Sequence, residues 1–433
     1  MATNARTLDI AKDTLLGRMG LIRVCKSILR GHGEPRLFSV TAIPAKTSFY
    51  MGNDIAGEAG AVGFTYEQAV QGAIGECVER YSCAVYDPDA LVYASKEELG
   101  DEAVGMDAFT IHAPEQYDQP RWPFARWTPD KRIRWTEGKS LTTGQRRYIP
   151  ACLVYVPYLP AKGEDILCLS VSSGQSCHTD RMRALLTGLY EVVERDAFMI
   201  SWLRRLRLPR VDYLADPEVA AVYNRYFGGC ELEFHVFDMT LDIRIPSYVC
   251  FAEGRSHRGP IIGMGASTRL SQREALTKAI LEAAQDMVWC RDLIRRKADW
   301  RPEPGWTNIR DFEDHVRLYC EPDMRPALSF LLDSPARTKL DPAPDRERSS
   351  EEMLTWCVDH LRDLGLEAIV VDTTAPDVAS AGFYSPKIFI PGTVPLTAVH
   401  RLQALGSPRL RAVPPKMPYE SSEDFNPFPH PFP

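Results

Sequence analysis

Residues 184–195 read Ala-Leu-Leu-Thr-Gly-Leu-Tyr-Glu-Val-Val-Glu-Arg, and the spacing of this stretch recurs twice more in the 433-residue chain. Residues 69–80 (AVQGAIGECVER) and 275–286 (ALTKAILEAAQD) repeat the pattern Ala-x-x-x-(Ala/Gly)-x-x-Glu-x-x-(Glu/Gln). Positions three and four apart share one helix face, so each stretch predicts a helix with a small-residue stripe that ends in acid. A favoured N-cap residue stands four positions before each first Ala. These caps are Thr65, Asp180 and Ser271, with Gln68 and Glu274 completing capping boxes in the first and third copies.

The acidic side chains of the three helices suggest the chemistry of the protein. Small residues let helices approach closely, so we expect five carboxylates to gather: Glu76, Glu79, Glu191, Glu194 and Glu282. Carboxylates at a partly dry site repel one another unless a cation neutralises them. Because the ligand set is all oxygen, it favours a hard cation, and magnesium that holds phosphates is the best candidate.

A solvated helix face is the alternative interpretation of any single copy of this pattern. Ala/Glu helices are common, and a Glu-x-x-Glu pair arises by chance in most proteins of this size. Here the same spacing recurs three times with a cap in register, and apolar residues such as Val70, Leu189 and Ile280 flank the acids. Acids among apolar neighbours are costly unless they are paired or metal-bound, so the three copies together favour the functional interpretation.

Composition excludes several classes of protein. The chain is 45% apolar and 25% charged, as is usual for a globular enzyme with a sizeable core. A formal charge of −7 argues against nucleic acid as the main partner, and the absence of any 18-residue apolar run argues against a membrane span. Residues 1–18 lack the apolar core of a signal peptide. Eleven cysteines without a C-x-x-C pair, and dispersed histidines, predict reduced thiols, a cytoplasmic protein and no zinc site.

Strand and helix patterns alternate along the chain, which predicts an α/β fold. Helices are expected at 17–29, 66–86, 181–206, 272–297 and 350–364. Strands are expected at 37–43, 132–136, 148–158, 231–240, 246–252, 260–266, 367–373 and 387–390. A Gly-rich loop is expected at 57–63, and a surface insertion or mobile loop at 299–345. Residues 408–433 contain too many prolines for regular structure.

Three features allow two interpretations each. Arg80 and Arg195 follow the second Glu of their helices, and each could form a structural ion pair or contact a phosphate. The loops before the helices resemble phosphate cradles, but the acids lie about 16 Å along the helix axis from the caps, which favours phosphates held through metal. The tail Asn426-Pro-Phe-Pro-His-Pro-Phe-Pro433 could dock as a polyproline stretch, or its end could insert a carboxylate into an active site.

These motifs together resemble the YcaO family, and specifically its azoline-forming cyclodehydratases, which modify ribosomally made peptides. The stretch from Gly63 to Tyr81 resembles the first family motif, residues 184–197 the second and residues 275–285 the third. Asp372-Thr-Thr-Ala-Pro and Ile390-Pro-Gly392 resemble late landmarks of the family. The Pro-x-Pro-x-Pro tail formed by Pro429, Pro431 and Pro433 resembles that of the azoline-forming branch.

The resemblance implies an α/β fold of its own kind, with mixed sheets and three helices converging on one site that binds ATP and Mg²⁺. It implies one domain over residues 1–433: a lead-in to residue 60, an ATP-binding core at 61–405 with the insertion at 299–345, and a tail at 406–433. The implied metal-site residues are Glu76, Glu79, Glu191, Glu194 and Glu282. The implied ATP contacts are Arg80, Ser173, Glu191, Arg195, Lys278 and Gln285, and the implied catalytic support is Pro429, Pro431 and Pro433.

The implied reaction is the ATP-dependent conversion of Cys, Ser or Thr of a precursor peptide to an azoline. Thioamide or amidine formation, and a non-catalytic scaffold that binds a peptide or partner enzyme, are the alternatives. Expected partners are the peptide, a separate E1-like or winged-helix protein that binds its leader, and a flavin-dependent azoline dehydrogenase; the oligomeric state, a homodimer included, stays open. The sequence departs from the family at Gly60-Ala-Val-Gly63, which lacks the usual lysine, at Gly72, and at Ser173-Gly174, where relatives have Asn-Gly.

Overall fold

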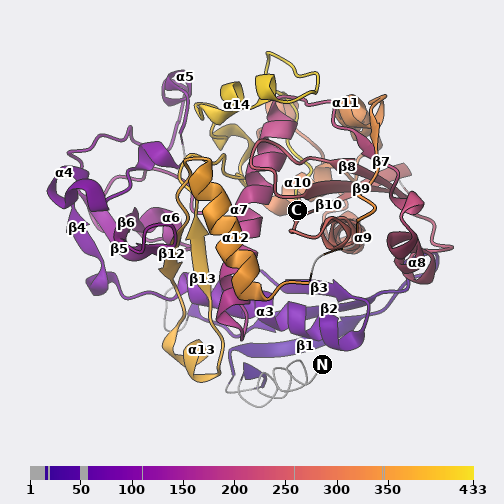
Figure 1. Ribbon diagram of the computed structural model, residues 1–433, viewed down its shortest axis with the longest axis horizontal. Helices are drawn as coiled ribbons and strands as arrows, with labels where there is room; N and C mark the ends of the chain where they lie inside the picture. The colour runs from indigo at the N-terminus through magenta and orange to yellow at the C-terminus, as the bar shows by residue number, and fades with distance from the viewer. Residues whose placement is uncertain are drawn as a thin grey trace.

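Three sheets and three long helices build the α/β fold of the protein (Figure 1). The computed structural model describes residues 15–17, 20–48, 57–109, 111–257, 259–343, 345 and 347–433. The first sheet is antiparallel, in the order β1 (Ile22–Ile28), β2 (Phe38–Pro44), β3 (Ala59–Gly63). Most of residues 1–18, where we expect no signal peptide, lie outside the described residues.

The second sheet has five strands and carries the longest hairpin. Its order is β10 (Gly259–Thr268), β9 (Ser247–Ser256), β8 (Glu233–Asp238), β7 (Arg210–Val211), β11 (Arg337–Thr338). β9 and β10 pair antiparallel from Gly259 opposite Ser256 to Thr268 opposite Ser247. Since β11 runs parallel to β7, the sheet is mixed.

The third sheet joins segments from both halves of the chain. Its order is β13 (Pro386–Phe389), β12 (Ile369–Asp372), β5 (Ile133–Ser140), β4 (Val92–Ala94), and β6 (Arg146–Pro150) pairs with β5. The other α-helices of the described residues are shorter: α4 (Lys96–Leu99), α5 (Pro114–Tyr117), α6 (Ala151–Val154), α8 (Pro217–Tyr226), α10 (Phe312–Leu318), α11 (Ser329–Leu332), α12 (Ser350–Asp363), α13 (Pro376–Ser380) and α14 (Arg409–Ala412).

The three signature helices are α3 (Tyr66–Ala84), α7 (Arg181–Leu203) and α9 (Gln272–Arg296), and their predicted N-caps are confirmed. Thr65 forms a full capping box with Gln68. The third capping box is only half formed: Ser271 accepts the Glu274 N–H, but no reciprocal bond from the Glu274 side chain is present. That carboxylate lies 3.6 Å from Arg269, so an ion pair replaces the expected bond.

The small-residue stripes pack against strands and loops, which corrects the expectation that they pair helix with helix. A Cβ at Gly265 of β10 would lie 2.4 Å from the Ala279 carbonyl of α9. A Cβ at Gly188 of α7 would lie 2.6 Å from the carbonyl of Gly174 and 3.0 Å from Ile388 of β13. Each helix therefore lies as close to its support as its backbone allows, and the acids one turn further on are fixed relative to the sheets.

Several local predictions are wrong for identifiable reasons. Residues 22–28 form strand β1, not a helix, because they pair with β2. Residues 59–63 form strand β3, not a loop, because glycine and alanine can occupy an edge strand that a helix covers. The strand expected at 148–158 ends at Pro150, where α6 begins. The segment 299–345 is not a surface insertion: Val316, Leu318 and Tyr319 are at most 1% exposed.

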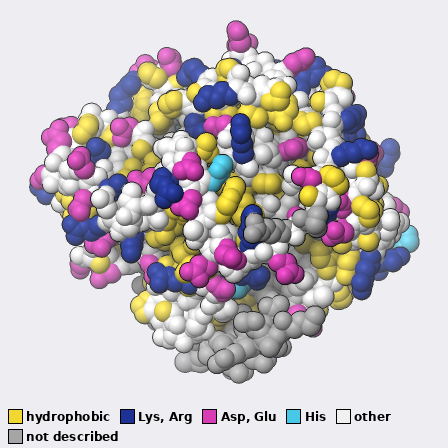
Figure 2. All heavy atoms as spheres, viewed as in Figure 1, with side chains coloured by type: hydrophobic (Ala, Val, Ile, Leu, Met, Phe, Trp, Pro, Cys, Tyr) yellow, Lys and Arg dark blue, Asp and Glu magenta, His cyan; other side chains and the backbone are white. Residues whose placement is uncertain are grey.

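Helix α7 lies at the centre of the molecule, beside α12 and β13 on one side and β10 on the other (Figure 1). Its apolar side chains contribute to two separate parts of the core, one with α12 and one with β9 and β10. Figure 2 shows acidic and basic side chains interspersed over the outer face. The acids of α7 differ from these surface charges because they are embedded among apolar neighbours.

All eleven cysteines are free thiols, as expected, and both cysteines of α3, Cys77 and Cys83, are buried. None of the helices in the described part of the chain combines the length and the apolarity that a membrane crossing requires. The division into lead-in, core and tail remains a prediction.

Asp286 provides a test of the core beneath α9. It is 3% exposed, one oxygen accepts the Met264 N–H at 2.8 Å, and the other has no hydrogen-bond partner. Burial raises the pKa of this carboxyl to about 8. The unfolded chain therefore ionises first, and folding stability falls as the pH rises from about 4 towards 8, by at most about 1.4 kcal/mol per pH unit.

We expect Asp286→Asn to remove this pH dependence. The thermal midpoint of the variant minus that of the wild type should increase between pH 5 and pH 8, because only the wild type has a carboxyl that must stay protonated. Asp359→Asn, at the exposed face of α12, is the control and should leave the difference constant. A constant difference for Asp286→Asn as well would contradict the raised pKa.

Candidate active site

Strand β3 links the acids of α3 to α9. The Glu76 carboxylate accepts the Gly60 N–H at 3.0 Å and pairs with Arg80 at 2.6 Å. The Gln285 side-chain amide donates to the Gly60 carbonyl at 2.8 Å. One residue of β3 is therefore held by two of the predicted site residues, and this brings the first and third signature helices together.

Arg195 forms ion pairs with two glutamates of its own helix, α7. Its guanidinium lies 2.7 Å from Glu194 and 3.2 Å from Glu191. The second oxygen of Glu194 accepts the Thr268 N–H at 3.1 Å, which ties α7 to the end of β10. On α9, Lys278 lies 3.4 Å from Glu282. Both arginines therefore form the ion pairs that the sequence left as one alternative, but an ion pair on a carboxylate does not exclude a phosphate contact.

The pKa values of these acids depend on charges from all three helices, so the side chains interact electrostatically. Burial raises the pKa of Glu79 well above its ordinary range, and the neighbouring charges of Glu191 and Glu76 raise it further. Burial also raises the pKa of Glu194 to about 7, with Glu282 and Glu191 adding to the shift. Glu79 therefore interacts with Glu76 and Glu191, and Glu194 with Glu191 and Glu282, while Arg195 and Lys278 offset part of the repulsion on Glu191.

The donor set suits magnesium better than any softer ion. Five carboxylates and four cationic side chains, Arg80, Arg195, Lys278 and Lys387, interact in this part of the molecule, so acidic groups outnumber basic ones by one. Among the described residues, no three acidic, His or Cys side chains stand close enough together to hold a metal as they lie. Hard oxygen ligands and uncompensated charge fit Mg²⁺, and the ligand roles of the individual acids remain predictions.

Ser173 lies in the loop that supports α7 from the other side. The carbonyl of Gly174 accepts the Ile388 N–H at 2.8 Å, and Gly174 has φ of +83°, a conformation that favours glycine. Ser173 itself is half-buried. The loop therefore stands beside Gly188, one turn before Glu191, and a nucleotide contact by Ser173 stays a prediction.

Lys387 is a site neighbour that the sequence analysis did not single out. Its ammonium is 1% exposed and donates to the carbonyls of Leu153, Val154 and Val171 at 2.6–3.1 Å. Burial lowers its pKa to about 8, while Glu191 and Glu79 are among the charges that raise it. A lysine within an apolar strand was the available signal, and its position shows that it fixes the Ser173 loop next to the acids.

The C-terminal segment, residues 427–433, contacts the same site. The Arg195 guanidinium lies over the Phe432 ring at 3.9 Å, and that ring contacts Phe198 with 4.8 Å between centroids. In Figure 1 the end of the segment lies between α7, α9 and α10. The expectation that residues 408–433 have no regular structure is wrong at its start, where α14 and a 3-10 turn at Pro414–Lys416 form, because proline is tolerated at the first positions of a helix. Residues from 417 onward have no regular structure, yet His430 and Phe432 are buried. Phe432 thus brings this segment to Arg195, and the catalytic role of Pro429, Pro431 and Pro433 remains a prediction.

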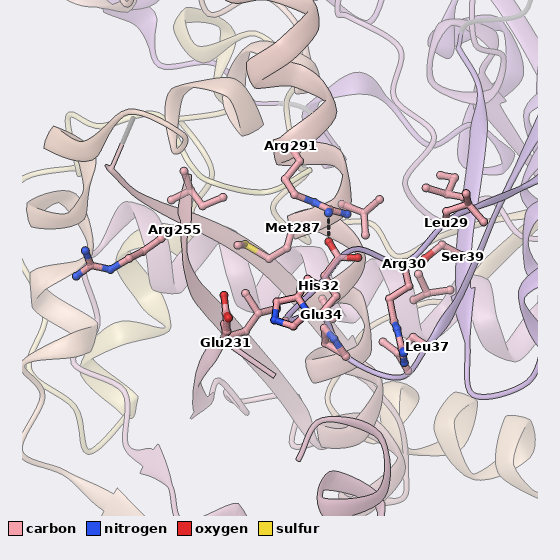
Figure 3. Close-up of a pocket in the computed structure, with 18 residues that line it drawn as sticks. Leu29, Arg30, His32, Glu34, Leu37, Ser39, Glu231, Arg255, Met287 and Arg291 are labelled. Carbon is pink, nitrogen blue, oxygen red and sulfur yellow. Dashed lines mark ion pairs between the residues drawn. The ribbon is translucent and has the colours of Figure 1, made fainter. Parts of the chain in front are cut away.

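Two cavities lie near α9. The one in Figure 3 has a volume of about 110 Å³, and Glu34 pairs with Arg291 across it. None of the predicted site residues lines it, so we do not assign it to the site. The other, of about 460 Å³, is lined by Lys278, Arg273, Gln68 and Phe64, and Lys278 connects it to the site through its ion pair with Glu282.

Comparison with known families agrees with this geometry. Residues 60–394 match the family described as YcaO cyclodehydratase, ATP- and Mg²⁺-binding. This chain belongs to the YcaO family. Its cofactors are therefore ATP and Mg²⁺, as the sequence predicts, and the protein is an ATP-dependent enzyme of the YcaO class.

Two relatives each share a quarter of their aligned residues with this chain. An uncharacterized protein of Methanothermobacter thermautotrophicus is 25% identical over 328 residues, which cover 73% of this chain and 81% of that protein. A protein of Rhizobium leguminosarum bv. trifolii, encoded in the tfuA 3′ region, is 25% identical over 57% of this chain. The chain spans 59% of that second relative.

Solved YcaO structures share the fold. A heterocyclase in complex with substrate and cofactor superimposes with a TM-score of 0.77 and 23% identity, covering 99% of this chain and 57% of that one. YcaO from Methanopyrus kandleri, bound with AMPPCP and Mg²⁺, gives a TM-score of 0.62 and 19% identity, covering 90% and 91%. The heterocyclase TruD gives 0.63 and 25% identity, covering 83% and 50%. The predicted α/β fold with mixed sheets is confirmed.

Proposed function

We propose that this YcaO protein is an ATP-dependent cyclodehydratase that converts Cys, Ser or Thr of a ribosomally made precursor peptide to azolines. The observation that carries the proposal is the packing of the Pro-x-Pro-x-Pro segment against Arg195, in the middle of the acidic cluster. This segment is the sequence feature that favours azoline formation over thioamide or amidine formation.

The proposed reaction removes an amide oxygen, which is a poor leaving group. A side-chain thiol or hydroxyl of the peptide loses its proton and attacks the preceding carbonyl carbon, which closes the five-membered ring, and the resulting oxyanion takes the γ-phosphoryl group of ATP and leaves ADP. Phosphate then departs with the former carbonyl oxygen, and the amide nitrogen loses its proton as the C=N double bond of the azoline forms. The demands on the protein are positioning and charge neutralisation, as in other phosphoryl transfers.

The chain's own residues divide these tasks. Glu76, Glu79, Glu191, Glu194 and Glu282 would hold Mg²⁺, which would neutralise charge on the phosphate oxygens when bound. Arg195, whose guanidinium pairs with Glu191 and Glu194, is proposed to contact a phosphate of ATP. Arg80, Ser173, Lys278 and Gln285 are proposed as further ATP contacts. Since Gln285 and Glu76 both bind Gly60, β3 couples the metal and nucleotide parts of the site.

The proposal includes partner proteins. The McbBCD microcin synthetase of E. coli, a structural neighbour with a TM-score of 0.55, is a complex solved with pro-MccB17 bound. By analogy we propose a precursor peptide substrate, a separate leader-binding protein of the E1-like or winged-helix type, and a flavin-dependent dehydrogenase acting on the azoline. A homodimer and a cytoplasmic location remain part of the same proposal.

ATP turnover with a Cys- or Ser-rich peptide and its delivery protein tests the function. We expect phosphate release together with the loss of one water mass per modified residue, measured by intact mass spectrometry. Phosphate release without that loss would point to thioamide or amidine chemistry. No turnover at all would leave only the non-catalytic scaffold.

Removal of Pro429–Pro433 tests the role of the C-terminal segment. We expect cyclisation to fall by about a hundredfold or more, since Phe432 no longer orients Arg195, while nucleotide affinity changes by less than about tenfold. Cyclisation is measured by mass spectrometry and affinity by calorimetry. Unchanged cyclisation would return this segment to a purely structural role.

A further inference from the structure

The backbone of the C-terminal segment is held by side chains of two other elements. Trp202 of α7 donates its indole N–H to the Phe428 carbonyl at 3.1 Å. The Tyr319 hydroxyl donates to the Pro429 carbonyl at 2.7 Å, and the His315 Nδ1–H donates to the His430 carbonyl at 2.6 Å. Three successive carbonyls thus each accept one hydrogen bond from a different side chain.

This arrangement follows from the chemistry of proline. A Pro-x-Pro-x-Pro stretch is extended, makes no internal backbone hydrogen bonds and has an N–H only at alternate residues. Its register must therefore be set by donors to its carbonyls. Tyr319, His315 and Trp202 are each at most 1% exposed, so no water competes for those carbonyls.

The imidazole ring of His430 adds two hydrogen bonds and a stacking contact to this arrangement. Its Nδ1 accepts the Phe432 N–H at 3.2 Å, so the proton resides on Nε2, which donates to the Thr397 carbonyl at 3.0 Å. The His430 ring also stacks on His315, with 3.9 Å between centroids and 6° between planes. Burial holds the pKa of His315 at about 4 and that of His430 well below its ordinary value, so two neutral rings stack without repulsion.

We propose that His315 and Tyr319, from α10 and its C-cap, are positioning residues that hold Phe432 against Arg195. The geometry makes this assignment: the bonds to Pro429 and His430 fix the backbone only two and three residues before the ring that lies over the guanidinium. The segment 299–345, which the sequence suggests is a surface insertion, thus supplies His315 and Tyr319 as the donors that bind the C-terminal segment. We call these two residues the socket. The effect of these two residues on catalysis rests on the proposed function.

Hydrogen–deuterium exchange of the full chain tests the socket without relying on activity. The segment has backbone amides at Phe428, His430 and Phe432 only, so one peptide reports on it. Tyr319→Phe and His315→Leu each remove a donor, and we expect exchange in this peptide to accelerate about tenfold, equivalent to about 1.4 kcal/mol. His315→Asn keeps a donor at the position of Nδ1 and should restore protection.

Matched controls separate positioning from general stability. Tyr248→Phe changes a tyrosine on β9 that is 2% exposed and belongs to a different part of the core from Tyr319 and Phe432, so it should leave the segment's exchange unchanged. Wild-type exchange in Tyr319→Phe and His315→Leu, or equal exchange in His315→Asn and His315→Leu, would overturn the proposal. So would an acceleration spread equally over α3 and α9, because that would report global unfolding.

Kinetics link the socket to the site. Tyr319→Phe and His315→Leu should lower kcat for peptide cyclisation while leaving the KM for ATP within about twofold, and His315→Asn should recover kcat. A raised KM with unchanged kcat would overturn the positioning role. If the wild type cyclises no peptide, the proposed function fails, and the exchange experiment alone decides whether α10 holds the segment.

Discussion

We expect Glu191→Gln to lower ATP turnover by about a hundredfold or more while leaving the chain folded. The substitution keeps the shape of the side chain and removes its charge. Glu191 occupies the middle of the cluster: it pairs with Arg195 at 3.2 Å, and its charge raises the pKa of both Glu79 and Glu194. An amide would weaken the hold on Arg195 and remove one proposed oxygen ligand of the metal.

Turnover is measured by phosphate release at saturating ATP and Mg²⁺, and folding by the thermal midpoint. Glu282→Gln, on α9, should behave in the same way if both acids serve one site. The control is Glu274→Gln on the same helix, because that carboxylate is 64% exposed and lies outside the cluster. Near-normal turnover by Glu191→Gln would refute its assignment to the metal and nucleotide site.

The second large effect is on stability: Arg409→Met should destabilise the protein by about 3–5 kcal/mol. Arg409 of α14 binds Asp196 of α7 through two nitrogens, at 2.9 and 2.6 Å, and Asp242 at 3.0 and 2.7 Å. The Asp196 side chain is 2% exposed and also accepts the Val394 N–H. Methionine fills similar space but leaves a buried carboxylate without its cation.

The loss should depend on pH in a defined direction. Burial already raises the pKa of Asp196 even with Arg409 in place, so removing the cation raises that pKa further. The variant can relieve the unpaired charge by binding a proton, and the loss is therefore smaller at pH 5 than at pH 8. Urea unfolding at the two pH values measures it, with the exposed Arg411→Met on the same helix as the control. Equal, small losses in both variants would show that the ion pairs contribute little.

Local sequence patterns were sufficient for the three signature helices. The caps at Thr65, Asp180 and Ser271 and the 3.6-residue periodicity act within one helix, so they are visible without tertiary information. The wrong predictions concern features that depend on contacts outside the element itself. Strand β1 exists because it pairs with β2, and the half-formed capping box at Glu274 reflects an arginine that precedes the helix.

The sequence by itself determined which acids the helices present, since residues three and four apart share a face whatever surrounds the helix. Only the tertiary structure decided that α3, α7 and α9 pack on strands and loops through their small residues. It also decided that Gly60 joins Glu76 to Gln285. Finally, it decided that α10 and its C-cap hold the C-terminal segment at Arg195. Those contacts join residues far apart in the chain. Their geometry depends on how closely packed backbones approach, which no local periodicity encodes.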